Sequence, residues 1–337
     1  MKEALFYENL ENQKVHCFLC RHHCEINDGK RGICGVRENR GGTLYTLVYG
    51  FPCSHHVDPI EKKPLFHFYP GSKAFSIATV GCNFRCRHCQ NHEISQIRKD
   101  DGHIYGQRMT PSEVVEGALK SGCKSISYTY TEPTIFFEYA LDCAKLSKEK
   151  GICSNFITNG YIEQEPLKTI RPYLDGANID LKSFNHDFYK KVCGAELDNV
   201  LASIRTFRSL GIWIELTTLV IPGYNDSEDE FRAITRFIKN DLGTETPWHV
   251  SAFYPTYKLT DVSRTPAKTL QRAREIGFEE GLRYVYTGNI PGEDGENTYC
   301  WSCKKLVVGR YGYTISEYNI KDGACLFCGA IIDGVGM

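Results

Sequence analysis

The sequence has no long apolar run and almost no net charge. Its 337 residues carry 40 lysines and arginines against 41 aspartates and glutamates, a formal net charge of −1. This balance gives no bulk field that attracts nucleic acid or an anionic membrane, and no basic stripe with interleaved aromatics stands out. No run approaches the roughly twenty apolar residues of a membrane span, and the first residues contain no signal-peptide core. We therefore expect a soluble, cytoplasmic protein with no membrane partner and no nucleic-acid partner.

Internal repeats and low-complexity stretches are also missing, whereas cysteine is abundant, with 16 residues. In a reducing compartment, clustered cysteines favour metal ligation over disulfides. Three clusters are present: Cys17, Cys20, Cys24 and Cys34; Cys82, Cys86 and Cys89; and Cys300, Cys303, Cys325 and Cys328. The five others are scattered and are expected to be small buried hydrophobes: Cys53, Cys123, Cys143, Cys153 and Cys193.

Between the outer clusters, apolar runs of strand length alternate with segments of helical period, the pattern of βα units around a parallel sheet. Strands are predicted at 73–80, 124–128, 154–158, 177–181, 213–220 and 248–253. Helices are predicted at 134–148 and 227–239, with another that begins at Pro111 behind a capping box of Thr110 and Glu113. Six units are too few for a closed eight-stranded barrel.

The expected fold is therefore α/β, a partial (βα)6 TIM-like barrel with a small Cys-rich, metal-binding segment at each end. The predicted domains are a Cys-rich segment at 1–70, a core at 71–290 and a zinc-ribbon-like segment at 291–337. Reactive groups belong at the carboxyl ends of the strands in such a sheet.

The stretch GCNFRCRHCQ, residues 81–90, places Cys82, Cys86 and Cys89 directly after the first predicted strand. Four thiolates close a zinc knuckle or a ferredoxin cluster, but three leave one iron of a four-iron cluster without a protein ligand. That iron is free to bind a substrate or a cofactor. The alternative is a zinc site completed by His88 or His92.

This C-x3-C-x2-C motif resembles that of radical S-adenosylmethionine enzymes. The resemblance implies that Cys82, Cys86 and Cys89 hold a [4Fe-4S] cluster, whose open iron binds the amino and carboxylate groups of S-adenosylmethionine. One electron then splits the sulfonium into methionine and a 5′-deoxyadenosyl radical, which abstracts hydrogen from a substrate. Reduced ferredoxin or flavodoxin is the electron donor that the resemblance implies.

The same resemblance implies contacts to the cofactor after the first two strands. His88 occupies the position of a planar residue near the adenine. Tyr130, Thr131 and Glu132 precede Pro133 where the family often has Gly-Gly-Glu-Pro, so Glu132 keeps the carboxylate for the ammonium group. A solvated turn carboxylate is the alternative for Glu132.

Further contacts are implied after the third and fourth strands. Asp180 and Lys182 lie in a DLK tripeptide that resembles one in glycyl-radical activating enzymes, where such residues contact the ribose and carboxylate of the cofactor. A structural ion pair is the alternative. Ile157 stands where those enzymes carry an acidic residue, so Asn159 is expected to take the polar contact. No catalytic side chain is identified.

A closer resemblance, over nearly the whole chain, is to the AmmeMemoRadiSam system radical enzymes, relatives of the pyruvate formate-lyase activating enzymes. It rests on five stretches: CFLCRHHCEINDGKRGICGVREN, DPIEKKPLFHFYPG, GCNFRCRHCQNHEIS, SYTYTEPTIFFEYA and VIPGYND. The resemblance implies Memo-like and AMMECR-like partners. It leaves open a protein-modifying or glycyl-radical-activating enzyme and a biosynthetic enzyme for a small molecule. The rival from another class is a non-catalytic zinc or iron–sulfur protein.

The cysteine spacing predicts the type of metal site more specifically in the carboxyl-terminal cluster than in the amino-terminal one. Two C-x2-C knuckles, at Cys300 to Cys303 and Cys325 to Cys328, predict one tetrahedral zinc site of the ribbon type, although iron fits the same thiolates. The amino-terminal spacing, C-x2-C-x3-C-x9-C, is less diagnostic. A structural zinc is the first expectation there and an auxiliary iron–sulfur cluster the alternative, with three histidines as possible substitutes: His16, His22 and His23.

Overall fold

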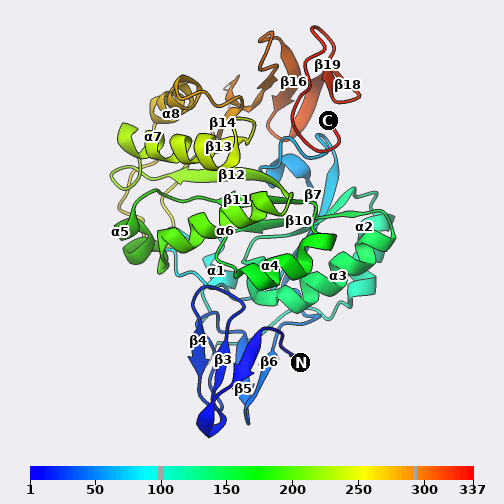
Figure 1. Ribbon diagram of the computed structural model, residues 1–337, viewed down its shortest axis with the longest axis vertical. Helices are drawn as coiled ribbons and strands as arrows, with labels where there is room; N and C mark the ends of the chain where they lie inside the picture. Colours follow the sequence, from blue (N-terminus) through cyan, green and yellow to red (C-terminus); the bar gives the residue numbers. More distant parts are fainter. Residues whose placement is uncertain (98–101, 291–293) are drawn as a thin grey trace.

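The computed structural model describes residues 1–97, 102–290 and 294–337 (Figure 1). The first three residues of the predicted segment 291–337 lie outside the described residues. None of the helices within the described ranges has the length and apolar character that a membrane crossing requires.

One sheet of eight strands forms the centre of the molecule, in the order β14-β13-β12-β11-β10-β9-β8-β7. Each strand from β8 to β14 pairs in parallel with the next along the chain, and β7 (Ser54–Pro59) pairs antiparallel with β8. The parallel strands are β8 Lys73–Ala78, β9 Ser125–Tyr128, β10 Cys153–Thr158, β11 Gly176–Asp180, β12 Trp213–Val220, β13 Trp248–Ala252 and β14 Val285–Gly288. The sheet ends at β7 and β14, so the predicted partial barrel is confirmed.

A helix follows each strand from β8 to β13, which confirms the six predicted βα units. These helices are α2 Pro111–Lys120, α3 Phe137–Glu149, α4 Gln164–Ile170, α6 Leu197–Ser209, α7 Glu228–Phe237 and α8 Ala267–Glu279. The predicted capping box opens α2, since the Thr110 hydroxyl accepts from Glu113 N–H at 3.3 Å and the Glu113 carboxylate from Thr110 N–H at 2.6 Å. Strands β7 and β14 were not predicted.

Short helical elements connect the larger ones. They are α1 His92–Ser95, α5 His186–Phe188, the 3₁₀ turns Glu11–Gln13, Ile60–Lys62, Pro133–Phe136, Arg171–Tyr173 and Asp294–Glu296, and the π turns Tyr189–Cys193 and Ile238–Leu242. The helix predicted from 134 thus begins as a 3₁₀ turn, and the one predicted to 239 ends in a π turn.

Small sheets lie at the two ends of the long axis of the molecule (Figure 1). The amino-terminal pair, β1-β6-β5 and β2-β3-β4, comprises β1 Lys2–Glu3, β2 Tyr7–Asn9, β3 Val15–Cys17, β4 Cys24–Ile26, β5 Arg37–Arg40 and β6 Thr43–Thr46. At the other end are β15 Thr298–Tyr299, β16 Leu306–Tyr311, β17 Thr314–Tyr318, β18 Ile320–Lys321 and β19 Ala324–Cys325. The domain boundaries stay predictions, and β7, which precedes residue 70, already belongs to the central sheet.

Residues 66–69 join the amino ends of the last strands to the carboxyl-terminal segment. The carboxylate of Glu215, near the start of β12, accepts from Phe66 N–H at 3.0 Å and His67 N–H at 2.8 Å, and it pairs with His249 Nε2 at 2.7 Å. From the other side, Tyr69 N–H donates to the Val335 carbonyl at 2.7 Å and Val335 N–H to the His67 carbonyl at 2.8 Å. The carboxyl-terminal segment is therefore attached at the edge of the sheet opposite to the strands' carboxyl ends.

Candidate cofactor and metal sites

The loop with Cys82, Cys86 and Cys89 follows β8 at the carboxyl edge of the sheet, as predicted. Cys82 and Cys86 are buried and Cys89 is partly exposed. Gly81 opens the loop with φ +97°, and a Cβ atom there would lie 2.6 Å from the Val36 side chain and 2.8 Å from the Cys34 carbonyl oxygen. Both the backbone conformation and the close packing therefore require glycine at this position.

Each of the three thiols has a hydrogen-bond partner in the surrounding protein. Cys82 Sγ accepts from Phe84 N–H at 3.3 Å and from Asn159 Nδ2 at 3.8 Å. Cys89 Sγ lies 3.0 Å from Ser95 Oγ. A hydrogen bond with the Cys193 thiol lowers the pKa of Cys86, although burial opposes this. Hydrogen bonds to sulfur stabilise the thiolate form, which is the form that binds iron, but burial outweighs them at the other two thiols and raises the pKa of Cys82 and of Cys89.

Cys193 is the functional candidate that the sequence did not reveal. It is buried, as expected of a scattered cysteine, but its sulfur lies within 4.8 Å of the donor atoms of Cys86 and His88. It is the last residue of the π turn Tyr189–Cys193. This turn is bonded to the cysteine loop, since Arg85 N–H donates to the main-chain carbonyl of Cys193 at 2.8 Å. π turns often occur at functional sites. No spacing pattern connects Cys193 to the motif.

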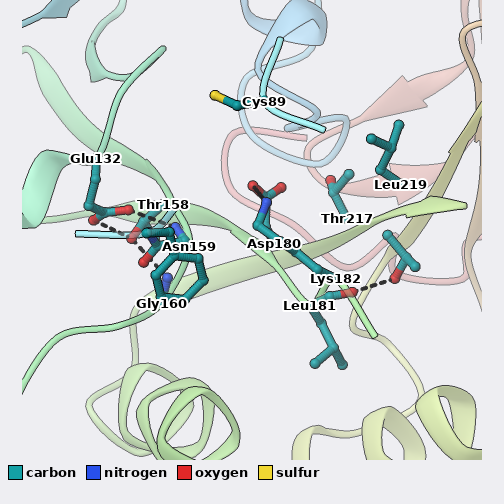
Figure 2. Close-up of polar contacts among 12 residues, drawn as sticks. Cys89, Glu132, Thr158, Asn159, Gly160, Asp180, Leu181, Lys182, Thr217 and Leu219 are labelled. Carbon is teal, nitrogen blue, oxygen red and sulfur yellow. Dashed lines mark hydrogen bonds and ion pairs between the residues drawn. The ribbon is translucent and has the colours of Figure 1, made fainter. Parts of the chain in front are cut away.

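Glu132 lies at the junction of the carboxyl ends of β9 and β10, with only 1% of its surface exposed. Oε1 accepts from Thr134 N–H at 3.0 Å, from Thr134 Oγ1 at 2.6 Å and from Thr158 Oγ1 at 2.8 Å, while Oε2 accepts from Asn159 N–H at 2.8 Å (Figure 2). Burial raises the pKa of Glu132, against these hydrogen bonds. The solvated-turn alternative is wrong for this carboxylate.

The two residues before Glu132 make contacts within the protein. Tyr130 has φ +62°, a conformation that glycine adopts freely, so this backbone keeps the shape for which the family often uses glycine. Its phenol donates to Asp58, and its carbonyl accepts from Asn91 Nδ2 of the cysteine loop at 2.8 Å. Thr131 Oγ1 donates to the Thr79 carbonyl at 2.8 Å. Their cofactor contacts stay predictions.

Asn159 connects the end of β10 to the cysteine loop. The side-chain Nδ2 donates to Asn83 Oδ1 at 2.8 Å and to Cys82 Sγ at 3.8 Å, and the side-chain Oδ1 accepts from Tyr161 N–H at 3.0 Å. The side chain is thus occupied in positioning the loop. The predicted polar contact to the cofactor is untested.

Asp180 and Lys182 form the ion pair that the alternative interpretation anticipated, with Lys182 Nζ 2.7 Å from Asp180 Oδ2. Figure 2 shows Asp180 and Thr217 on the side of the strands that faces Cys89, while Leu181 points to the other side. Burial acts to lower the pKa of Lys182, but Asp180, Cys86 and Cys193 outweigh it and raise that pKa well above its usual value. The pair is close enough to the thiols to interact with them, and its cofactor role stays a prediction.

His88 is 4% exposed, and its Nδ1 atom has no hydrogen-bond partner among the described residues. Burial, together with the charge of the nearby Lys182, lowers the pKa of His88 to about 3. The ring is therefore neutral at physiological pH. An unpartnered nitrogen on a neutral ring beside the cysteine loop suits a contact with a heteroaromatic base.

The fold and this arrangement define a class of enzyme that places a three-cysteine loop after the first strand of a partial barrel. A family profile, the Radical SAM superfamily, matches residues 76–238. An uncharacterized protein of Methanocaldococcus jannaschii is 50% identical over 335 residues, 99% of each chain. The chain belongs to the radical SAM superfamily and is a radical SAM enzyme.

Two more distant similarities agree with this membership. A pyruvate formate-lyase-activating enzyme of Clostridium pasteurianum is 24% identical over 199 residues, 54% of this chain and 80% of that one. The structure of a radical SAM methyltransferase from Sphaerobacter thermophilus matches with a TM-score of 0.52 and 16% identity over 71% of each chain. At that identity the structural match supports the fold alone.

Membership in the superfamily implies a [4Fe-4S] cluster and S-adenosylmethionine. The donor set fits, because Cys82, Cys86 and Cys89 leave one iron of such a cluster open. Of the two histidines in the zinc alternative, His88 has a ring nitrogen within 4.8 Å of the sulfurs of Cys86 and Cys193, whereas the ring of His92 stacks on Tyr257 with centroids 4.6 Å apart.

The four carboxyl-terminal thiols have the geometry of a site for a single metal ion. Their sulfur atoms all lie within 4.8 Å of one another, with Cys300 and Cys328 separated by 3.6 Å and Cys303 and Cys325 by 3.8 Å. A zinc ion with Zn–S bonds of about 2.3 Å in a tetrahedron sets its sulfur atoms about 3.8 Å apart. The predicted metal site is therefore preformed, and zinc remains the prediction for its occupant.

Replacement of Cys325 by serine is expected to lose about one equivalent of zinc, because four thiolates close the tetrahedron. The loss should expose the segment after residue 300 to proteases, since its small core depends on the metal. Formation of 5′-deoxyadenosine without substrate should largely survive, because the loop of Cys82, Cys86 and Cys89 lies at the edge of the sheet opposite to the carboxyl-terminal segment. Zinc analysis, limited proteolysis and product assay test this, with Cys123→Ser as the control. Iron in place of zinc in aerobically purified protein would contradict the assignment.

Proposed function

We propose that Cys82, Cys86 and Cys89 hold the [4Fe-4S] cluster at which S-adenosylmethionine is reductively cleaved, and that the enzyme then abstracts hydrogen from a protein substrate. The observation that carries the proposal is the convergence of four strand ends. The carboxyl ends of β8, β9, β10 and β11 bring together the three thiols, Glu132, Asn159 and the pair Asp180–Lys182.

The cluster, when bound, supplies the electron that splits S-adenosylmethionine into methionine and a 5′-deoxyadenosyl radical. Glu132 is assigned to the ammonium group. Its carboxylate is buried, and the hydrogen bonds that it accepts in the described chain come from neutral N–H and O–H groups, so a bound cation would stabilise its negative charge. His88 is assigned to the adenine and Asp180 with Lys182 to the ribose and the carboxylate. Cys193 forms a hydrogen bond with Cys86, and the Asn159 amide donates to Cys82, so both orient proposed ligand sulfurs.

Two features are compatible with a protein substrate of the kind that activating enzymes modify. The sheet ends at β7 and β14, so its strands do not close into a full barrel around the site. A relative is named as a pyruvate formate-lyase-activating enzyme. We further propose membership in the AmmeMemoRadiSam system enzymes, with Memo-like and AMMECR-like partners, reduced ferredoxin or flavodoxin as donor, and a cytoplasmic location.

The test uses deuterium transfer to identify the class of substrate. An extract of cells grown in heavy water is separated into a macromolecular and a small-molecule fraction, and each is incubated anaerobically with reconstituted enzyme, S-adenosylmethionine and dithionite. Deuterium in 5′-deoxyadenosine with the macromolecular fraction is the expected result. Deuterium with the small-molecule fraction instead would favour a biosynthetic enzyme. No 5′-deoxyadenosine under any condition would refute the reductive cleavage itself.

A further inference from the structure

The amino-terminal cysteines converge on a single cavity. Cys17 in β3 and Cys24 in β4 are directly paired across the two antiparallel strands. Together with Cys20 and Cys34 they line one small cavity, whose remaining walls are mainly aliphatic. The four sulfur ligands are thus available to one metal centre.

The spacing of these thiols differs from that at the carboxyl-terminal site. The four carboxyl-terminal sulfurs lie within 4.8 Å of one another, which suits one ion. In the part of the chain that the structure describes, no three of the amino-terminal sulfurs lie that close together. A cubane of four irons is larger than one ion, so it needs more widely spaced thiolates. The geometry therefore favours a cluster over the zinc ion that was first expected here.

A buried cation lines the same cavity. Arg37 is 2% exposed, and its Nε and Nη1 atoms have no hydrogen-bond partner among the described residues. Nη2 pairs with the Glu138 carboxylate at 3.0 Å, which leaves the other donors for a further acceptor. The charge of Arg37 is balanced by Glu138, but its free N–H donors can form hydrogen bonds to the sulfurs of a cluster held by these four thiolates.

The cavity lies directly behind the loop of Cys82, Cys86 and Cys89. His22 Nε2, between Cys20 and Cys24 in the sequence, lies 2.8 Å from the Asn83 carbonyl oxygen. Arg85 of the loop donates to the carbonyl of Ile33, the residue before Cys34. The Cys34 carbonyl packs against Gly81, the residue before Cys82. Figure 1 shows the amino-terminal strands beside α1, which follows this loop. The main chain of residues 33–34 therefore packs against the loop that carries Cys82, Cys86 and Cys89.

We propose that Cys17, Cys20, Cys24 and Cys34 hold a second [4Fe-4S] cluster, which relays electrons to the cluster at Cys82, Cys86 and Cys89. The relay rests on the proposed function. An external one-electron donor of the ferredoxin or flavodoxin class is oxidised, and its electron passes through the second cluster to the first and ends in the carbon–sulfur bond that breaks. The second cluster returns to its starting state after each transfer. Four protein ligands leave it no open iron, so its role is conduction.

Metal content decides whether the second cluster exists. Anaerobically reconstituted protein should contain about eight irons per chain, and the triple variant Cys82→Ala, Cys86→Ala, Cys89→Ala about four. The double variant Cys17→Ser, Cys20→Ser should also retain about four irons. Cys53→Ser, outside all three clusters, is the matched control and should keep the wild-type count. An iron-free triple variant that holds zinc at the amino-terminal site would overturn the proposal. The triple variant leaves the amino-terminal segment intact. Its iron count therefore decides the question even if the double variant folds poorly.

A comparison of electron donors decides the relay. In the double variant, cleavage of S-adenosylmethionine driven by reduced flavodoxin should be lost, while cleavage driven by dithionite persists, because a small reductant reaches the partly exposed Cys89 directly. Equal retention with both donors would refute the relay. Loss of cleavage with both donors in an iron-retaining variant would also refute it. Failure of the wild type with dithionite would refute the proposed function instead, and the iron counts would still decide the second site.

Discussion

Replacement of Cys82, Cys86 and Cys89 together by alanine is expected to abolish 5′-deoxyadenosine formation and to remove about four irons per chain. The three thiols are the protein ligands available to a cluster with one open iron, and the loop that carries them is fixed by Gly81 and by hydrogen bonds to Cys82 and Cys89. The effect should be complete, because the proposed function places the electron transfer to the cofactor at this cluster. Product chromatography and iron analysis measure it.

Cys123→Ser is the control for this variant, because Cys123 is buried outside the three cysteine clusters. It should leave both iron content and product formation unchanged. If the triple variant kept the full iron content together with cleavage activity, the assignment of the cluster to this loop would be wrong.

Replacement of Glu132 by glutamine should weaken the binding of S-adenosylmethionine by about ten- to a hundredfold, or roughly 1.5–3 kcal/mol, the usual range for a hydrogen bond to a charged group. The change removes the negative charge assigned to the ammonium group. The amide NH2 group also takes the place of one acceptor: at Oε2 it would face the Asn159 N–H, which now donates at 2.8 Å, and at Oε1 the Thr134 N–H, which donates at 3.0 Å. Equilibrium binding to cluster-loaded protein measures the loss, and iron content should be unaffected.

The control for the glutamine variant is Asp175→Asn. The Asp175 carboxylate also accepts a backbone N–H, from Ser154 at 2.8 Å, but it lies before β11, at the amino edge of the sheet. It should not change the affinity for the cofactor. Unchanged affinity in the Glu132 variant would mean that this carboxylate serves only to join β9 to β10.

Most of the central fold followed from the sequence, because long buried strands carry apolar runs whose length and flanking turns identify them. Each of the six predicted strands lies within two residues of its observed bounds, and 213–220 matches β12 in full. The two strands that were missed are the edges of the sheet. β7, with the sequence SHHVDP, is polar, and β14 has only four residues. Edge strands are often short or polar, so they lack the signal that buried strands give.

The site was predictable where its residues follow strands and unpredictable where it depends on distant contacts. The cysteine motif and Glu132 could be read from local spacing. Cys193 could not, because a π turn far along the chain carries it to Cys86. The same holds for Arg37, whose pairing with Glu138 joins the amino-terminal sheets to α3. Spacing also gives the number of ligands but not the distances between them, so it does not distinguish zinc from a cluster.

The attachment of residues 333–335 to residues 66–69 sets an order of events during synthesis. The Val335 main chain bonds to His67 and Tyr69, so these contacts span most of the chain, and Asp333 beside it pairs with Arg283 at 2.9 Å. Contacts between such distant residues form late, because a long loop must close first. The residues around the cysteine loop, up to Cys193, leave the ribosome well before Asp333. The cysteine loop and its partner Cys193 are therefore synthesised before residues 333–335 can attach to the opposite edge of the barrel.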